Sequence, residues 1–252
     1  MIQVIKIGGG VLENEAQRDA FLRQFAAIEG PKILVHGGGR LATTMADRLG
    51  VETHMIDGRR VTDKETLDIV TMVYGGLVNK QVVAQLQTMG VNAIGMTGAD
   101  GGWMKAVKRP IKNGIDYGYV GDVVEVNGAH LRTLLDNGLT PVIAPITFSA
   151  DGLLLNTNAD TVASETAVSL APDVQLTFCF EKAGVLSNPD DESSLIASIT
   201  PETYTQLKAD GIISGGMIPK IDNAFAAIEH GVQSVRITHS NQIQGGTIIE
   251  QA

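Results

Sequence analysis

The feature that most constrains the fold is a junction that occurs twice near the start of the chain. In each copy an apolar run leads into three glycines and then into a segment with helical spacing. The first joins residues 2–7 (IQVIKI) to glycines 8–10, and the second joins residues 32–36 (KILVH) to glycines 37–39. Apolar runs rich in β-branched residues that end in glycine predict buried strands that turn into helices. The two junctions therefore predict a βαβ unit with parallel strands.

The glycine turns are also suited to holding phosphate. Glycine lets the backbone approach an anion closely, its N–H groups can point into the turn, and a helix N-terminus adds partial positive charge. Lys6 stands two residues before the first turn and adds a full charge. Because neighbouring parallel strands end at one edge of a sheet, we expect both turns to line one cleft. For a single turn, a packing role of the glycines would remain equally open.

The rest of the chain alternates helices with strands. A hairpin over residues 53–62 is expected to turn at Asp57-Gly58, and strands over 104–108 and 117–126 are expected to form an antiparallel flap. Asn158 is well placed to cap a helix whose first turn contains Asp160. Helices are predicted over residues 14–28, 41–49, 63–78, 79–89, 129–137, 159–170, 201–209 and from the segment 214–220 to 230, and further strands over 91–96, 140–145, 174–180, 234–238 and 247–250.

Composition argues against several classes of function. The 252 residues are 44% hydrophobic, enough for a full core, but no apolar run approaches the roughly 18 residues of a membrane span. A formal charge of −9 argues against nucleic-acid or anionic-membrane partners. Met1 leads straight into the first strand without a basic and apolar leader, so we expect a cytoplasmic protein. The single cysteine, Cys179, lies in an apolar run and is expected to pack in the core.

Five short motifs carry a resemblance that covers essentially the whole chain. They are KIGG at 6–9, VHGGG at 35–39, RVTD at 60–63, NTNAD at 156–160 and GGMIPK at 215–220. Each is weak alone, but together they make the chain similar to the amino acid kinase family. The resemblance implies an α/β fold, a three-layer αβα sandwich with a mainly parallel open sheet and two lobes. Residues 1–172 would bind an acyl amino acid and form a dimer, and residues 173–252 would bind ATP.

The resemblance assigns catalysis to three charged residues. Lys6 and Lys220 look like the two cations flanking the transferred phosphoryl group, and Asp160 resembles the acidic residue that holds them in place. Phosphoryl transfer requires two oxygens in line and neutralised charge on the equatorial oxygens, so fixed cations and backbone N–H groups suffice. His36 is expected to be a structural hydrogen-bonder rather than a base, because a γ-carboxylate is already ionised at neutral pH.

The binding residues implied by the resemblance are mostly glycines. They are Gly8, Gly9, Gly215 and Gly216 for phosphate and nucleotide, and Gly38, Gly39, Arg60 and Asn156 for the substrate. Arg60 would hold the α-carboxylate, a task that suits the geometry of guanidinium. Mg²⁺ would be carried on the ATP phosphates, since no carboxylate cluster in the sequence predicts a dedicated metal site.

The implied activity is ATP-dependent phosphorylation of the γ-carboxylate of N-acetyl-L-glutamate to N-acetyl-L-glutamyl 5-phosphate, the second step of arginine biosynthesis. Kinases of this family that act on carbamate, uridylate, free glutamate or acyl-aminoadipate are the nearest alternatives. A non-catalytic sensor of ATP and an amino acid would not need all three charged residues. We expect small-molecule partners and a homodimer insensitive to arginine, because arginine-inhibited relatives carry an extra helix before the first strand.

Two positions depart from the family pattern. Arg59 stands where relatives usually have an apolar residue, and a cation there suits a dicarboxylic acyl group, so N-succinyl-L-glutamate is an alternative substrate. Against this, neighbouring residues of an extended strand face opposite sides, so Arg59 would point into water. Many relatives have Asp and an apolar residue after the strand 174–180, where this chain has Glu181-Lys182, which leaves the nucleotide contacts open there. Trp103 is expected to pack beneath the flap rather than stack on adenine.

Overall fold

A computed structural model describes residues 1–56, 58–188, 190–214 and 217–251 of the chain. Its centre is an eight-stranded sheet in the order β12-β14-β13-β11-β1-β2-β8-β5. Neighbouring strands are parallel except β13 and β14, which confirms the predicted mainly parallel open sheet. The strands are β1 (Ile2–Ile7), β2 (Lys32–His36), β5 (Ala93–Met96), β8 (Thr140–Ile143), β11 (Val174–Phe180), β12 (Ser198–Ile199), β13 (Ser234–His239) and β14 (Thr247–Ile249).

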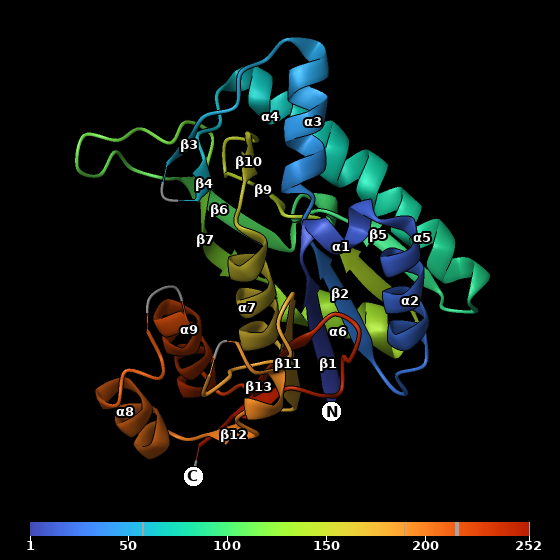
Figure 1. Ribbon diagram of the computed structural model, residues 1–252. Coiled ribbons are helices and arrows are strands. Elements are labelled where there is room, and N and C mark those ends of the chain that lie inside the picture. Colours follow the sequence, from blue (N-terminus) through green and yellow to red (C-terminus); the bar gives the residue numbers. More distant parts are fainter. Residues whose placement is uncertain (57, 189, 215–216, 252) are drawn as a thin grey trace.

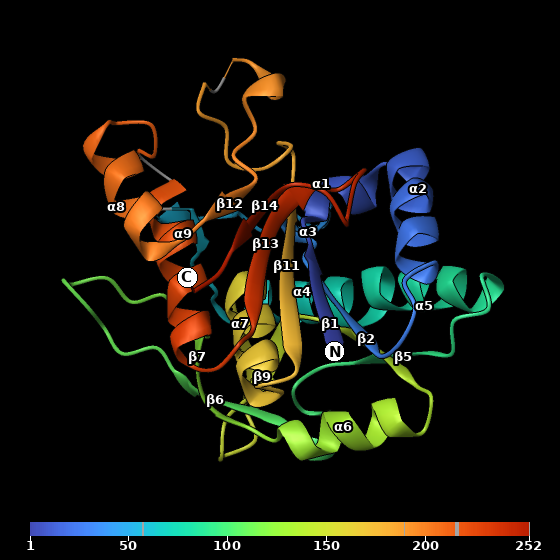
Figure 2. The same cartoon turned by 90° about the horizontal axis from the view of Figure 1, so that it is seen from below.

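Helices cover both faces of this sheet, which confirms the predicted three-layer αβα sandwich (Figures 1 and 2). Val4 of β1 packs in the core cluster that includes α7 and α9, whereas Ile5 packs in the cluster that includes α2 and α5. Because strand side chains alternate between faces, Lys6 lies on the α7 side. One layer contains α6 (Gly128–Asp136), α7 (Ala159–Ser169), α8 (Pro201–Ala209) and α9 (Met217–Glu229), and the other α1 (Gly9–Glu13), α2 (Glu15–Ala26), α3 (Gly39–Leu49), α4 (Lys64–Val70) and α5 (Asn79–Thr88).

A second sheet contains the predicted flap. Its four strands are β10 (Leu154–Asn156), β9 (Ile146–Phe148), β6 (Met104–Lys108) and β7 (Gly121–Val126), in that order. β6 and β7 pair antiparallel, as expected, and the loop between them projects from the body of the molecule (Figure 1). Trp103, directly before β6, is buried in the core, and its indole N–H donates to the Thr97 carbonyl over 2.7 Å, so its predicted packing role is confirmed.

The segment after α3 differs from expectation in one respect. The predicted hairpin is present as β3 (Met55–Ile56) and β4 (Arg59–Arg60), although Asp57 of its turn lies outside the described residues. The helix expected to run without interruption over residues 63–78 instead changes from α4 into a π-helix, η1 (Thr71–Val78). Gly75 and Gly76 lie in η1, and glycine lowers the preference for regular α-helix. The two-residue strand β12 was too short to be predicted.

The predicted lobe boundary falls directly before β11. Since β11 pairs with β1, one continuous sheet runs through both predicted lobes, and their division at residue 172 stays a prediction. Cys179 of β11 is fully buried, as expected, and burial raises the pKa of its thiol to about 12. Among the described residues, no helix is long and apolar enough to cross a membrane.

The two glycine turns lie side by side, because β1 and β2 are parallel neighbours. The Gly37 N–H donates to the Ile7 carbonyl over 3.1 Å. A Cβ atom added at Gly9 would come within 2.9 Å of the Gly38 nitrogen, closer than real Cβ atoms approach. The close contact between the two turns therefore requires glycine at position 9.

His36, at the end of β2, holds the second turn to the sheet. It is fully buried; Nδ1 donates to the Gly37 carbonyl over 2.7 Å, and Nε2 accepts from the Asn79 amide over 3.1 Å. Asn79 also donates to the Val142 carbonyl, which ties β2, α5 and β8 together. Burial lowers the pKa of His36 to about 4, although the hydrogen bond to the Gly37 carbonyl acts in the opposite direction and raises it. The neutral imidazole is therefore a structural hydrogen-bonder, as predicted.

We expect the protein to lose stability as the pH falls below about 6.5. An unfolded-chain histidine binds a proton near pH 6.5, whereas folded His36 does so only near its pKa of about 4, so acid favours the unfolded state. The stability that comes from keeping His36 neutral is fully present above pH 6.5. As the pH falls towards 4, the free energy of unfolding decreases by about 3 kcal/mol. Urea unfolding at about pH 7 and about pH 5 measures it. His36→Gln should remove this part of the pH dependence, whereas the control His54→Gln, at an exposed histidine, should keep it. If the free energy of unfolding changes equally with pH in the parent and in His36→Gln, the assignment to His36 is wrong.

Candidate active site

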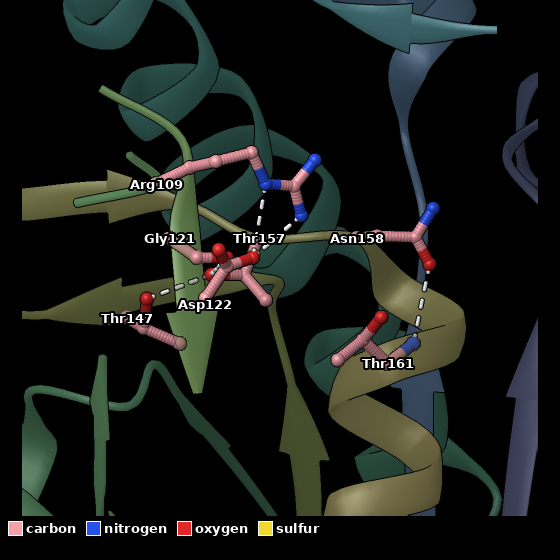
Figure 3. A network of polar contacts seen from close by, with 7 residues as sticks. All are labelled: Arg109, Gly121, Asp122, Thr147, Thr157, Asn158 and Thr161. Atoms are coloured by element: carbon pink, nitrogen blue, oxygen red, sulfur yellow. Dashed lines mark hydrogen bonds and ion pairs between the residues drawn. The ribbon is translucent and has the colours of Figure 1, made fainter. Parts of the chain in front are cut away.

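Two of the predicted catalytic residues form an ion pair at the carboxyl edge of the main sheet. Lys6 projects from β1 towards α7, and its Nζ lies 2.8 Å from Asp160 Oδ1 in the first turn of that helix. Asn158 caps α7, and its side-chain oxygen accepts from the N–H groups of Asp160 and Thr161 (Figure 3 shows the contact to Thr161). The cap fixes the start of α7 and therefore the position of the carboxylate.

Lys220, in the first turn of α9, approaches the same place from the other side. Its Nζ lies 3.8 Å from the centre of the Phe180 ring, and Lys6 Nζ lies 5.6 Å from the same ring. Burial lowers the pKa of Lys220. The charge of Asp160 acts in the opposite direction and raises this pKa, whereas the charge of Lys6 lowers it further. The structure thus brings Lys6, Asp160 and Lys220 together. Two ammonium groups above one aromatic ring form a site for an anion.

The turn that starts at Gly8 leaves room beside these cations. Gly8 precedes α1, and a Cβ atom built there would meet nothing within 4 Å. Its backbone is therefore accessible to a ligand, which fits the expected phosphate contact. Gly215 and Gly216, predicted for the nucleotide, lie outside the described residues.

A cavity of about 210 Å³ adjoins the cations and contains the predicted substrate residues Gly38, Gly39, Arg60 and Asn156. Arg60 is buried, and its Nη2 donates to the Gly39 carbonyl and to Thr43 Oγ1, each over 2.8 Å. Its Nη1 donates to Thr53 Oγ1 over 3.1 Å. Among the described residues, Arg60 has no carboxylate partner. A buried cation with neutral partners favours an anionic ligand.

The flap closes one side of this cavity. Asn156, at the end of β10, donates from its amide to Thr62 Oγ1 over 3.0 Å. Arg109 also lines the cavity, and its Nε and Nη2 donate to Asp122 Oδ1 (Figure 3). Thr147 and Thr157 share a hydrogen bond of 2.8 Å beside this pair. Thr157 Oγ1 also donates to the Gly121 carbonyl of β7 over 3.4 Å, so the flap is tied to the segment that leads into α7.

Arg59 faces away from Arg60. Arg60 is buried and Arg59 is exposed, in agreement with the alternation expected of an extended strand. Arg59 borders the 210 Å³ cavity and also a groove of about 400 Å³ between α7 and α9, whose lining includes Asp160 and Lys220. Asn158 also borders both, so the cavity and the groove meet beside the Asp160 carboxylate.

Three residues at the site were missed in the sequence. Phe180 lies beneath the two lysines. The only sequence feature that could have indicated this position is an aromatic residue at the end of a predicted strand, between the two motifs that contain the lysines. Tyr74 lines the 210 Å³ cavity. In the sequence it lies within an apolar helical run, and its hydroxyl is the one feature that distinguishes it from the purely apolar residues of that run. Arg109 carried no signal, since a charged residue after a flap strand usually faces solvent.

The segment after β11 makes a contact that the sequence left open. Glu181 Oε1 lies 3.7 Å from Arg40 Nη2, and both side chains are largely exposed. A pair of this kind contributes little stability, about 0–1 kcal/mol. Within the described ranges no group of three or more His, Cys, Asp or Glu side chains could hold a metal ion.

Comparisons with known proteins agree with this geometry. The model of the amino acid kinase family matches residues 1–239. Acetylglutamate kinase from Phocaeicola vulgatus is 54% identical over 99% of this chain and 98% of its own length, and the enzyme of that name from Cytophaga hutchinsonii is 54% identical over 96% and 92%. The solved structure of smu.665 from Streptococcus mutans UA159 is 29% identical over 99% of this chain and 98% of that one, with a TM-score of 0.77.

These matches span nearly the whole chain, and the family match over residues 1–239 includes Lys6, Arg60, Asp160 and Lys220. The chain belongs to the amino acid kinase family.

Proposed function

We propose that this ATP-dependent kinase phosphorylates the γ-carboxylate of N-acetyl-L-glutamate, yielding N-acetyl-L-glutamyl 5-phosphate and ADP in arginine biosynthesis. The observation that carries the proposal is the meeting of Lys6, Asp160 and Lys220 beside a cavity that contains the buried Arg60. Relatives 54% identical over nearly the full chain are named for N-acetylglutamate. N-succinyl-glutamate, the other acceptors of the family and a non-catalytic sensor are therefore not favoured.

The chemistry needs orientation and charge more than a protein base. A γ-carboxylate oxygen attacks the γ-phosphorus of ATP, the bond to the β-phosphate oxygen breaks, and ADP leaves with its electron pair. Lys6 and Lys220 would neutralise charge on the transferred group, and Asp160 would hold Lys6 in position. Mg²⁺, bound through the ATP phosphates, would neutralise further charge.

The arrangement of the cavity and the groove supports the orientation of the two substrates. Arg60 would hold the α-carboxylate at one end of the cavity, with Gly38, Gly39 and Asn156 around the rest of the acyl amino acid. Its γ-carboxylate would then point towards the junction at Asn158. The glycine turn at Gly8 and Gly9 would receive the phosphates of ATP. Residues 1–172 would thus hold the acceptor, and residues 173–252, with Gly215 and Gly216, the nucleotide. A cytoplasmic location and small-molecule partners, without nucleic acid or membrane, stay predictions.

The proposed acceptor can be tested by measuring ADP formation with a panel of compounds. We expect turnover to be highest, by kcat/KM, with N-acetyl-L-glutamate, because relatives that are 54% identical to this chain are named for it. The panel should include N-succinyl-L-glutamate, L-glutamate, carbamate and uridylate. A preference for another member would replace the proposed acceptor, and ADP formation with none would favour the sensor. Arg59→Leu tests whether the exposed arginine alters the ratio of acetyl to succinyl substrates.

Removing either catalytic cation should lower kcat strongly. Lys6→Ala and Lys220→Ala each remove a charge that stabilises the transition state, and we expect losses of roughly 100- to 1,000-fold. Asp160→Asn should be similarly severe, because it removes the partner of Lys6. Lys208→Ala, an exposed lysine on α8, is the matched control and should leave kcat unchanged. Near-normal turnover in Lys6→Ala or Lys220→Ala, with an unchanged melting temperature, would reject the assignment.

We also propose that the chain forms a homodimer. Apolar side chains are exposed on η1 (Met72 and Leu77) and on the edge strand β5 (Ile94), which lies beside α5. A second copy could cover this surface. Light scattering should give twice the mass of the chain, and Met72→Glu should shift the equilibrium towards monomer. A monomeric or hexameric parent protein would contradict the proposal.

A further inference from the structure

Tyr74 stands between the second glycine turn and the substrate cavity. It lies in the π-helix η1, is 5% exposed and lines the cavity with Arg60. A Cβ atom added at Gly38 would come within 2.9 Å of Tyr74 Cδ1 and 3.1 Å of Cε1. The ring therefore packs directly against the turn, and glycine at position 38 is what allows this contact.

The hydroxyl of Tyr74 lies next to the Arg60 guanidinium. Tyr74 Oη and Arg60 Nη2 both lie 4.0 Å from the position that a Cβ atom would take at Gly39. The guanidinium can only donate hydrogen bonds, so next to it the phenolic oxygen acts as acceptor. Burial raises the pKa of Tyr74, with Arg60 acting in the opposite direction, so the hydroxyl keeps its proton at neutral pH.

That proton has no acceptor among the residues that the structure describes. Packing alone does not explain the hydroxyl, because phenylalanine would fill the same space against Gly38. Tyr74 lines the cavity, so an anion bound there can accept from its hydroxyl, and a hydrogen bond to an ionised acceptor is stronger than one to a neutral acceptor. The group that Arg60 attracts would supply such an acceptor.

We propose that Tyr74 is a substrate-binding residue whose hydroxyl donates a hydrogen bond to the α-carboxylate held by Arg60. This inference rests on the proposed function, in which that carboxylate belongs to N-acetyl-L-glutamate. Tyr74 and Arg60 together make the cavity selective for an acyl amino acid over an acylated amine without the α-carboxylate. Tyr74 takes no part in the phosphoryl transfer itself.

The test is the variant Tyr74→Phe, which keeps the ring against Gly38 and removes only the hydroxyl. Loss of a hydrogen bond to a charged group should raise KM for N-acetyl-L-glutamate by about tenfold, with kcat changed less than about threefold. KM does not depend on the fraction of folded enzyme, so a modest loss of stability does not obscure the result. Tyr204→Phe, on α8, is the matched control and should leave KM unchanged. A KM for Tyr74→Phe within about twofold of the parent overturns the proposal.

A substrate analogue tests which group the hydroxyl contacts. 4-Acetamidobutanoate is N-acetylglutamate without the α-carboxylate, and its inhibition constant should be the same, within about twofold, for parent and Tyr74→Phe. A tenfold difference would assign the hydroxyl to another part of the substrate and overturn the proposal. Arg60→Gln separates the two hypotheses. If it raises KM while Tyr74→Phe does not, only this inference fails; if the parent does not turn over N-acetyl-L-glutamate, the proposed function fails.

Discussion

The ion pair between Lys6 and Asp160 is the contact on which the site depends. It joins the central strand β1 to the first turn of α7, with 2.8 Å between Nζ and Oδ1. Lys220 enters from α9 and shares the Phe180 ring with Lys6, so two ammonium groups are held close together. Their repulsion is offset by one carboxylate and one aromatic face. A phosphoryl group between them would offset it further, which is why this pair favours a phosphate-transfer site over a purely structural one.

The charge of the molecule is distributed unevenly, and this explains how an acidic protein can bind anions. The formal net charge is −9, yet Lys220, Arg60 and Arg109 line one cavity and its adjoining groove, and Lys6 pairs with Asp160 in the lining of that groove. Asp160 and Asp122 pair with Lys6 and Arg109. Arg60 is held by two threonines and a backbone carbonyl, and no carboxylate of the described residues pairs with it. Its charge is thus open to an anionic ligand.

The sequence predicted what depends on local pattern. Strands β1, β2 and β11, the glycine turns and the cap at Asn158 follow from periodicity and from the conformations that these residues prefer. The π-helix η1 was not predicted, because residues 71–78 continue the apolar helical run of α4 and no local pattern marks the change from α-helix to π-helix. Phe180, Tyr74 and Arg109 were missed for a similar reason. Each gains its position from a contact with a residue far away in the sequence, and no motif records such contacts.

The segment 156–160 contributes both to the wall of the cavity and to the ion pair with Lys6. Asn156 lines the substrate cavity and bonds to Thr62, Thr157 bonds to Thr147 beneath the flap, and Asn158 caps the helix that carries Asp160. Asn158 also borders both the cavity and the groove. One wall of the cavity and the carboxylate beside Lys6 are therefore positioned by residues that lie within five positions of each other in the sequence. A displacement of this short segment would change the cavity wall and the Lys6–Asp160 ion pair together, because both depend on the same stretch of backbone.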